Sequence, residues 1–289
     1  MSGNVKRQEV VELSRGWGQD VPAPLLDRFC DRIAPSHRLV PRRGGAGSLG
    51  VSRIGGQPDL PAGTAWPVFR GFPGKPRAEQ WERFVGFPLP FLAQVKLDEL
   101  PALDGDRILP GSGMLYFFYL DATETFGLYA EHGEVFHVLY VTPTPTTLSR
   151  VPFPGELPER LRFDGHAVEP RLEWTLPSPY DLIDEALGVE AVEAHLDLWD
   201  HGEELLQRQA LGPHYHPRHR VLGNPDLIQT FGLDRGARLL LQVDSDSSLS
   251  DYPRTRMSWG DGGRIYFLID EPDLLAGQLQ RAWAYFECS

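Results

Sequence analysis

Closely spaced aspartates are the strongest cation-binding signal in this sequence. The segment DSDSSLSD contains Asp244, Asp246 and Asp251, and Asp261 follows in WGDGG. Alternating carboxylates suit Ca²⁺, but the EF-hand pattern fails because its glycine and its final glutamate are missing. The alternative is turn chemistry, in which aspartates cap loop backbone and Asp-Gly precedes a strand. The metal-ligand candidates are Asp244 and Asp246.

Three histidines lie within six residues in the segment HYHPRH. Imidazoles as close as those of His214, His216 and His219 can share a transition metal. No cysteine or acid stands beside them, and exposed loop histidines explain the same pattern. Both interpretations stay open.

Motifs for nucleotide binding and catalysis are weak or missing. The segment GAGSLG fits G-x-G-x-x-G through Gly45, Gly47 and Gly50, but that motif needs a strand before it and a helix after it. Arg and Pro precede this segment and the strand-like SRI follows it, which indicates a flexible glycine turn. Nothing matches a nucleophile elbow, a P-loop, H-E-x-x-H or a zinc finger. We assign no catalytic residues and no cofactor, and the sequence leans against an enzyme without deciding the question.

The 289-residue chain is acidic. It has 40 Asp and Glu against 28 Lys and Arg, a formal net charge of −12. Phosphate backbones and anionic lipids repel such a chain, so nucleic acid and membrane surfaces are poor partners. A basic protein partner or a cation fits better, although solubility alone also explains the charge. The two cysteines make no disulfide framework, no apolar leader occurs, and we expect a cytoplasmic protein of undetermined oligomeric state.

Residues 179–211 have helical periodicity. Their apolar side chains follow a 3/4 spacing, interrupted by Gly202, which is typical of a stripe packed on the protein's own core. Between Asp181 and Glu204 there are nine acids and no Lys or Arg. Such a run is usually a solvated face, and it is also the best surface for a charged partner. The partner-binding candidates on it are Glu190, Glu193 and Asp197.

The sequence pattern changes from helical to strand-like near residue 48. Residues 5–14 and 22–34 have apolar positions at helix spacing, so we expect a helical arm over residues 1–45. From about residue 48, short runs rich in Phe, Tyr, Val and Leu indicate strands. Proline-dense residues 142–160 predict an extended connector. A domain is therefore expected over 46–289, in two halves of about 46–150 and 161–289.

Three signals occur twice in the same order. GGQPDLPAG, FLAQVKLDEL and GSGMLYFFYLD correspond to LGNPDLIQT, LLLQVDSDSS and GDGGRIYFLID. Divergent duplication explains the repetition, and the near-continuous apolar runs predict strands covered on both faces. The predicted fold class is α+β, with a duplicated, mainly antiparallel β core, flanking helices and an N-terminal helical arm.

The repeated segments also contain ligand-binding candidates. Gln94 and Gln242 lie within otherwise apolar strands, where a buried amide must find partners. Those partners are either backbone groups or a ligand. Trp259 and Asp261 come just before the last repeated strand. We expect any ligand site formed by these four residues to lie between the two halves.

Several of these segments together resemble a known family. SRIGGQPDLPAGTAWP, PLPFLAQVKLDELP, HRVLGNPDLIQ, LLLQVDSDS and SWGDGGRIYFLI are similar to the YwqG-like family, over roughly residues 50–289. The resemblance implies a bacterial protein with an α+β fold, a duplicated β core and no established function, so no catalytic residue is carried over. Some members look like immunity or accessory proteins near toxin genes.

Two functions follow from these features. The first is a non-catalytic protein-binding role, of a toxin-immunity or accessory kind, which rests on the acidic face and the missing catalytic motifs. The alternative is a protein that binds a small ligand or a divalent cation between the halves, either as a binding protein or as an enzyme. A scaffolding role is a third hypothesis.

Overall fold

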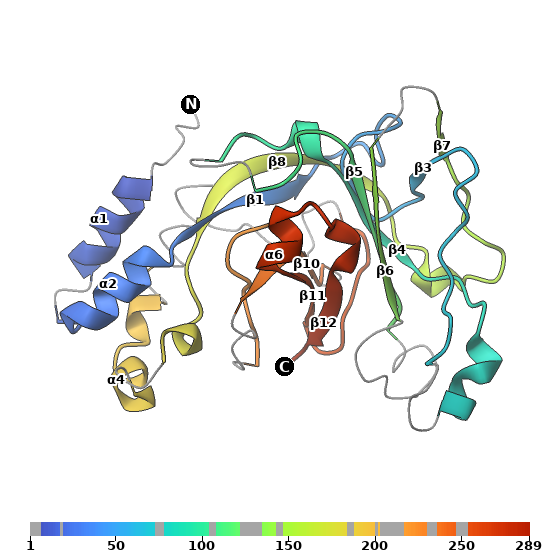
Figure 1. Cartoon of the computed structure of the whole chain (residues 1–289). Coiled ribbons are helices and arrows are strands. Elements are labelled where there is room, and N and C mark those ends of the chain that lie inside the picture. The colour runs from blue at the N-terminus through green and yellow to red at the C-terminus, as the bar shows by residue number, and fades with distance from the viewer. Residues whose placement is uncertain are drawn as a thin grey trace.

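Ten strands join in one antiparallel sheet (Figure 1). The computed structural model describes residues 7–17, 20–72, 78–103, 108–121, 135–142, 147–183, 188–199, 202, 217–229, 236–246 and 254–289. From one edge to the other, the strands are β12 (Trp283–Glu287), β11 (Arg264–Asp270), β10 (Ala237–Asp244), β9 (Arg220–Val221), β1 (Ala34–Pro41), β8 (His166–Thr175), β2 (Arg53–Ile54), β4 (Phe91–Lys96), β5 (Met114–Tyr119) and β6 (Phe136–Val141). The predicted antiparallel β core is confirmed.

The remaining elements are short. A second sheet pairs β3 (Asp59–Pro61) with β7 (Leu148–Arg150). Of these two strands, β7 lies inside the predicted extended connector of residues 142–160. The helical elements are α1 (Arg7–Trp17), α2 (Ala23–Asp31), η1 (Ala78–Phe84), η2 (Leu97–Glu99), η3 (Glu159–Leu161), η4 (Pro179–Leu182), α4 (Val189–Glu193), α6 (Glu271–Leu275) and η5 (Leu279–Arg281). In the part of the chain described, no helix has the length and apolarity needed to cross a bilayer.

The expected helical arm of residues 1–45 contains a central strand. α1 and α2 fall close to the expected ranges, but β1 follows them and pairs along its whole length with β8. Pro35 and Pro41 disfavour helix here, and Leu39 is fully buried in the main core. Residues 34–41 therefore belong to the sheet.

Residues 179–211 do not form one long helix where they are described. η4 and α4 are separate short turns, and Gly188 directly precedes α4. Val192 and Trp199 of the predicted apolar stripe are buried, whereas Val189 and Leu196 are exposed. Residues 203–216 lie outside the described residues.

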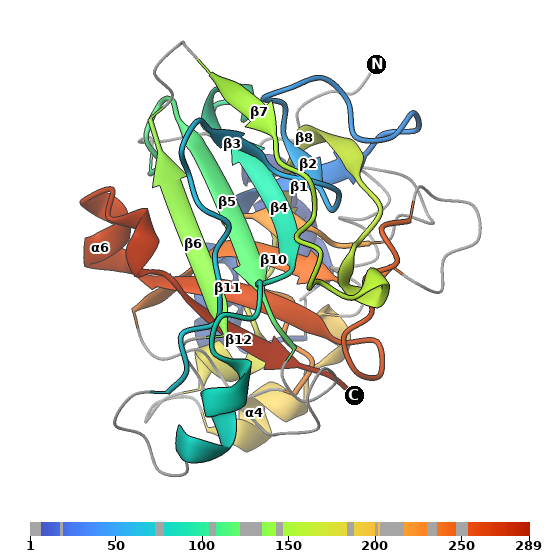
Figure 2. The ribbon, with the colours of Figure 1, turned by 90° about the vertical axis from the view of Figure 1, so that its right-hand side faces the viewer.

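The sheet folds so that its two ends face each other. Strands β4, β5 and β6 form a front layer that crosses over a rear layer of β10, β11 and β12 (Figure 2). The paired strands β1 and β8 form a central ribbon between the layers in the sheet order. Phe117 of β5 meets Phe267 of β11 edge to face, with ring centroids 4.9 Å apart. The two layers therefore share one core.

A helical lobe stands beside the sheet (Figure 1). Side chains from α1, α2, η4 and α4 enclose a smaller core of their own, in which Phe29 and Trp199 meet at 5.0 Å. The lobe contacts the sheet where β8 ends and β1 begins. This junction positions the cleft described below.

We expect Phe117→Ala and Phe267→Ala each to lower the free energy of unfolding by about 3–5 kcal/mol, because both rings are fully buried. Urea denaturation of the two single variants and the double variant measures their coupling. Since the rings touch, the double variant should lose less than the sum of the single losses, by about 0.5–1.5 kcal/mol. Strict additivity would contradict a direct contact between the layers.

Candidate functional site

Asp59 is a buried carboxylate whose partners come from four other segments. It pairs with Arg53 Nη2 at 2.8 Å and with Arg150 Nε at 2.9 Å. Gln94 Oε1 accepts from Arg53 and from the backbone N–H of Asp59, and its amide nitrogen donates to a backbone carbonyl and to the Asp59 carboxylate. The Tyr116 hydroxyl donates to the Asp59 carbonyl at 2.5 Å. All four hydrogen-bonding positions of the Gln94 amide are therefore used within the protein.

Asp226 has a similar environment in the second half. Its carboxylate pairs with Arg218 and Arg264, and its backbone N–H donates to Gln242 Oε1 at 2.9 Å. The Tyr266 hydroxyl donates to the Asp226 carbonyl at 2.6 Å. Burial by itself raises the pKa of Asp226, but the nearby arginines, Arg264 foremost, outweigh burial and lower the pKa to about 2.

A third buried charge cluster lies on the central ribbon. Glu173 of β8 accepts from Arg38 Nε at 2.8 Å and pairs with Arg220 Nε at 3.2 Å. Burial opposes the charged carboxylate, yet the two arginines lower the pKa of Glu173. Arg38 and Arg220 are opposite each other in the β1–β9 pairing. The glutamate thus fixes β9 against the ribbon.

Protein donors already surround the aspartates predicted to bind a cation. Asp244 accepts from Arg264 Nε at 3.0 Å and from two backbone N–H groups. Asp246 accepts from the Thr255 hydroxyl at 2.8 Å and from two backbone N–H groups. Across the described ranges, no three His, Cys, Asp or Glu side chains come together as a metal would require. This geometry favours the turn interpretation.

Only one member of the histidine cluster is described. His219 is fully buried, and its Nδ1 accepts from the Asp244 backbone N–H at 3.0 Å. Burial lowers the pKa of His219. His214 and His216 lie outside the described residues, as does Asp251.

The four ligand-binding candidates lie in different environments. Gln94 and Gln242 belong to the two buried aspartate networks. Trp259 is buried, and its indole Nε1 has no hydrogen-bond partner among the residues described. Asp261 is exposed in the turn before β11, as the Asp-Gly signal predicts.

The acidic candidates are all exposed: Glu190 and Glu193 lie on α4, and Asp197 begins the helical residues 197–199 that follow the turn of residues 194–196. Two apolar side chains are exposed among them, Val189 at 46% and Leu196 at 37%. Five other acids of the run lie outside the described residues: Asp184, Glu185, Asp200, Glu203 and Glu204. The described acidic surface therefore has an apolar component.

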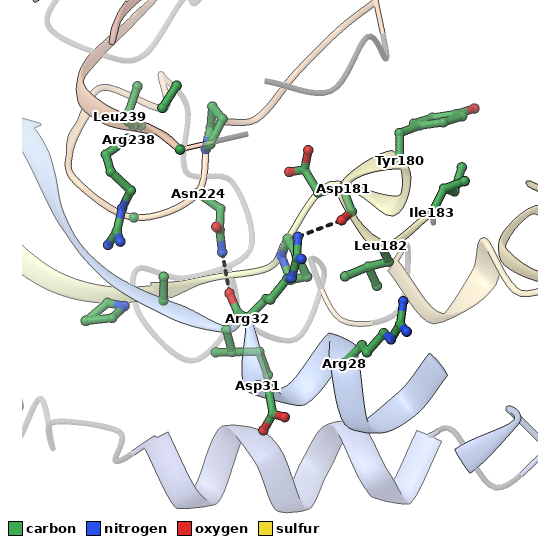
Figure 3. A pocket seen from close by; sticks show the side chains of 18 residues that line it. Arg28, Asp31, Arg32, Tyr180, Asp181, Leu182, Ile183, Asn224, Arg238 and Leu239 are labelled. Carbon is green, nitrogen blue, oxygen red and sulfur yellow. Dashed lines mark hydrogen bonds between the residues drawn. The ribbon is translucent and has the colours of Figure 1, made fainter. Parts of the chain in front are cut away.

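A cleft of about 710 Å³ lies between the helical lobe and the start of the rear layer (Figure 3). The end of α2, the start of β1, η4, the turn after β9 and the start of β10 line it. Its charged lining residues are Arg28, Asp31, Arg32, Asp181 and Arg238. Ligand-binding pockets typically have volumes of about 300–1,000 Å³, so this cleft is large enough for a small molecule.

Hydrogen bonds tie the walls of the cleft together. Arg32 Nη1 donates to the Asp181 carbonyl at 2.6 Å, and Asn224 Nδ2 donates to the Arg32 carbonyl at 2.8 Å (Figure 3). On the rear-layer side, Arg238 pairs with Glu271 at 2.6 Å. The lining itself has three guanidinium groups and two carboxylates, and Glu271 outside the lining offsets the charge of Arg238.

A known family model covers most of the chain. Residues 52–288 match a domain of unknown function, DUF1963. The chain belongs to the DUF1963 family. This confirms the expected uncharacterised domain family, and no curated protein matches the chain. Asp181, Asn224 and Arg238 of the cleft lie within the DUF1963 match, whereas Arg28 and Arg32 precede it.

The first of the three repeated segments, the one that contains P-D-L, can be extended towards the N-terminus, and the extension identifies two buried arginines. RIGGQPDL at 53–60 and RVLGNPDL at 220–227 also share an arginine, which places Arg53 and Arg220 in the buried clusters. Glu173 has no such signal, because a glutamate in a strand is expected at the surface. The cleft residues have none either, since they come from distant segments.

Replacing Asp226 by asparagine should remove about 2 kcal/mol of stability near neutral pH, the free energy equivalent of lowering its pKa from 3.8 to about 2. Because the folded pKa is depressed, this stability is fully present above the unfolded pKa and is lost as pH falls towards 2. Urea unfolding between pH 7 and pH 2 should show a shallower acid loss in Asp226→Asn than in the wild type.

The matched control is Asp164→Asn, which removes the exposed ion pair with Arg256. Surface pairs contribute about 0–1 kcal/mol, so this variant should stay close to the wild type. Equal effects of the two substitutions would contradict a special role for the partly buried Asp226 and its two arginines.

Proposed function

We propose that this DUF1963 protein is a non-catalytic binding protein and that it holds a small anionic ligand in the cleft. The single observation that carries the proposal is the polar cleft of about 710 Å³, with Arg28, Arg32 and Arg238 in its lining. Guanidinium groups match carboxylate and phosphate oxygens with paired donors. Asp31 and Asp181 offset part of this charge and disfavour ligands with several negative charges.

The lobe side of the cleft supports binding as well. Arg32 and Asn224 link α2, η4 and the turn after β9 by hydrogen bonds, so these walls are held before a ligand arrives. A preformed site loses less free energy to ordering when it binds. Tyr180 adds an aromatic face to the same lining.

The proposal predicts that small carboxylates or phosphate esters raise the melting temperature and neutral analogues do not. A ligand present at about 100 times its Kd adds about 2.7 kcal/mol to the free energy of unfolding. The double variant Arg28→Gln/Arg238→Gln should lose most of this effect. Arg83→Gln/Arg160→Gln, which removes two exposed arginines outside the cleft lining, is the matched control. The proposal fails if no anion stabilises the protein, or if the double variant responds like the wild type.

A second candidate function is binding of a basic protein, in a toxin-immunity or accessory role. The observation in favour is the exposed Val189 and Leu196 among Glu190, Glu193 and Asp197. Apolar contact supplies binding free energy, while the acids attract a basic partner and orient it. Such binding weakens as salt rises.

Charge reversal tests this second function. The triple variant Glu190→Lys/Glu193→Lys/Asp197→Lys should abolish capture of a basic partner that the wild type binds at low salt and releases at high salt. Glu79→Lys/Glu82→Lys/Glu156→Lys makes the same charge change at other exposed acids and should keep binding. Unchanged affinity of the first triple variant would rule out this surface.

We also propose that the sheet arose by duplication of a five-stranded unit. β1, β2, β4, β5 and β6 correspond in order to β8, β9, β10, β11 and β12, and the sheet order is symmetric about the central ribbon. Both ribbon strands contain H-x-[LV]-x-P, from His37 and from His166. His37 is opposite Val221, and His166 is opposite Ile54. The first strand of each proposed copy therefore pairs with the second strand of the other, β1 with β9 and β8 with β2.

The narrower assignments belong to the same proposal. They are YwqG-like membership, a bacterial origin and a cytoplasmic location. The shared motifs support the first two. The acidic composition suits the third, as does the lack of a helix able to cross a membrane in the described part of the chain.

A further inference from the structure

A small cavity of about 90 Å³ lies between the β4–β5 connection and the turn after β9. We call it the seam cavity, because its walls come from both proposed copies. Nine of its ten lining residues are apolar: Leu97, Leu100, Pro101, Ala102, Leu103, Ile108, Leu109, Pro110 and Leu222. The tenth is His37 of the central ribbon. The seam cavity shares no lining residue with the anionic cleft.

His37 is the polar group that marks the seam cavity as a site. The residue is only 2% exposed, and its Nδ1 is buried without a hydrogen-bond partner among the residues described. Burial outweighs the influence of Glu173 and lowers the pKa of His37 to about 4, so the ring is neutral at physiological pH. Because Nδ1 has essentially no accessible surface, Nε2 is the ring nitrogen that a ligand in the seam cavity can reach.

The corresponding position in the other proposed copy, where β8 meets β2, has a histidine whose ring is hydrogen-bonded within the protein. His166 corresponds to His37, and its Nε2 makes a hydrogen bond to the Arg254 carbonyl at 3.0 Å. There, Gly55 stands in the turn with φ +66°, whereas Leu222 holds the corresponding place with φ +60°. A leucine in this left-handed conformation is unusual, and its side chain lines the seam cavity. The Nδ1 of each histidine lacks a partner among the described residues, so the two seams differ at the other side of the ring: His166 Nε2 bonds to a carbonyl, whereas His37 borders the apolar cavity.

We propose that the seam cavity binds a small uncharged molecule with an apolar body and one hydroxyl group, which hydrogen-bonds to His37. A neutral imidazole has one donor and one acceptor nitrogen, and a hydroxyl can pair with either. A cavity of about 150 Å³ accommodates benzene, so a cavity of 90 Å³ suits a molecule of about four non-hydrogen atoms. The lining has no charged group, which excludes the anions expected in the cleft.

The test is an NMR titration of the full chain with 2-propanol, against its near-isostere 2-chloropropane. The alcohol should give saturable shifts of the Leu100 and Leu222 methyl groups and of the His37 ring nitrogens. The chloride should bind at least fivefold more weakly. Only linear, unsaturated shifts with the alcohol, or equal affinities for the two probes, would overturn the proposal.

Two matched substitutions separate the hydrogen bond from the fold. His37→Phe keeps an apolar ring and should lose the preference for the alcohol, whereas His166→Phe at the corresponding position should keep it. Retained preference in His37→Phe would overturn the role of the imidazole. If His37→Phe does not fold, the comparison of the two probes on the wild-type protein still decides the outcome. Failure of the anion experiment on the cleft would leave this test unaffected, because the two sites share no lining residue.

Discussion

Each P-D-L turn places a carboxylate among arginines, with Asp59 fully buried and Asp226 partly buried, and much of the sheet is organised around satisfying that charge. An ionised aspartate out of water costs several kcal/mol unless cations and N–H donors surround it. Around Asp59 the partners come in a row across three strands, because Arg53 is opposite Gln94 and Gln94 is opposite Tyr116. A one-residue slip of any strand would break the row and would also turn its apolar side chains out of the core.

The same row of arginine, glutamine and tyrosine recurs beside Asp226, but there the arginine pairs with a different carboxylate. Arg220, Gln242 and Tyr266 lie opposite one another across β9, β10 and β11. Arg53 reaches its own aspartate, whereas Arg220 turns to Glu173 on the ribbon. The second turn is therefore tied to the central ribbon by an ion pair. Asn224 in that turn forms part of the cleft wall, so the buried charges also hold the cleft in shape.

Sequence patterns predict the parts of this fold that depend on local chemistry. The apolar runs LYFFYL and IYFLI predict strands covered on both faces, and the residues of β5 are all buried as expected. The turn at Asp261 and the glycine turn at Gly45 follow from backbone preferences alone. β1 is missed because HRLVP is short, carries charge and follows a helix directly. Its strand conformation depends on β8, about 130 residues further along the chain.

The contacts of the candidate sites could not be predicted either, because they join segments that are far apart in the sequence. Gln94 and Gln242 stand out in the sequence because an amide interrupts an apolar run, but the pattern cannot show which atoms satisfy it. The cleft joins α2, η4, the turn after β9 and the start of β10, and no periodicity connects these segments. The net charge of −12 also gives no hint that three arginines line one cleft. Local charge at a site follows from which segments the fold brings together.

The distribution of charge predicts that salt affects binding differently at the two proposed surfaces, the acidic surface at α4 and the cleft. The acidic surface at α4 adds to the negative field of the whole protein, so it attracts cations over a distance that salt shortens to about 8 Å at physiological ionic strength. An anion approaching the cleft meets that field as repulsion and gains attraction only near the arginines. Salt weakens the repulsion as well as the attraction, so the two effects partly cancel for the anion. A strong salt dependence therefore belongs to a partner on the acidic surface, and a weak one to a ligand in the cleft.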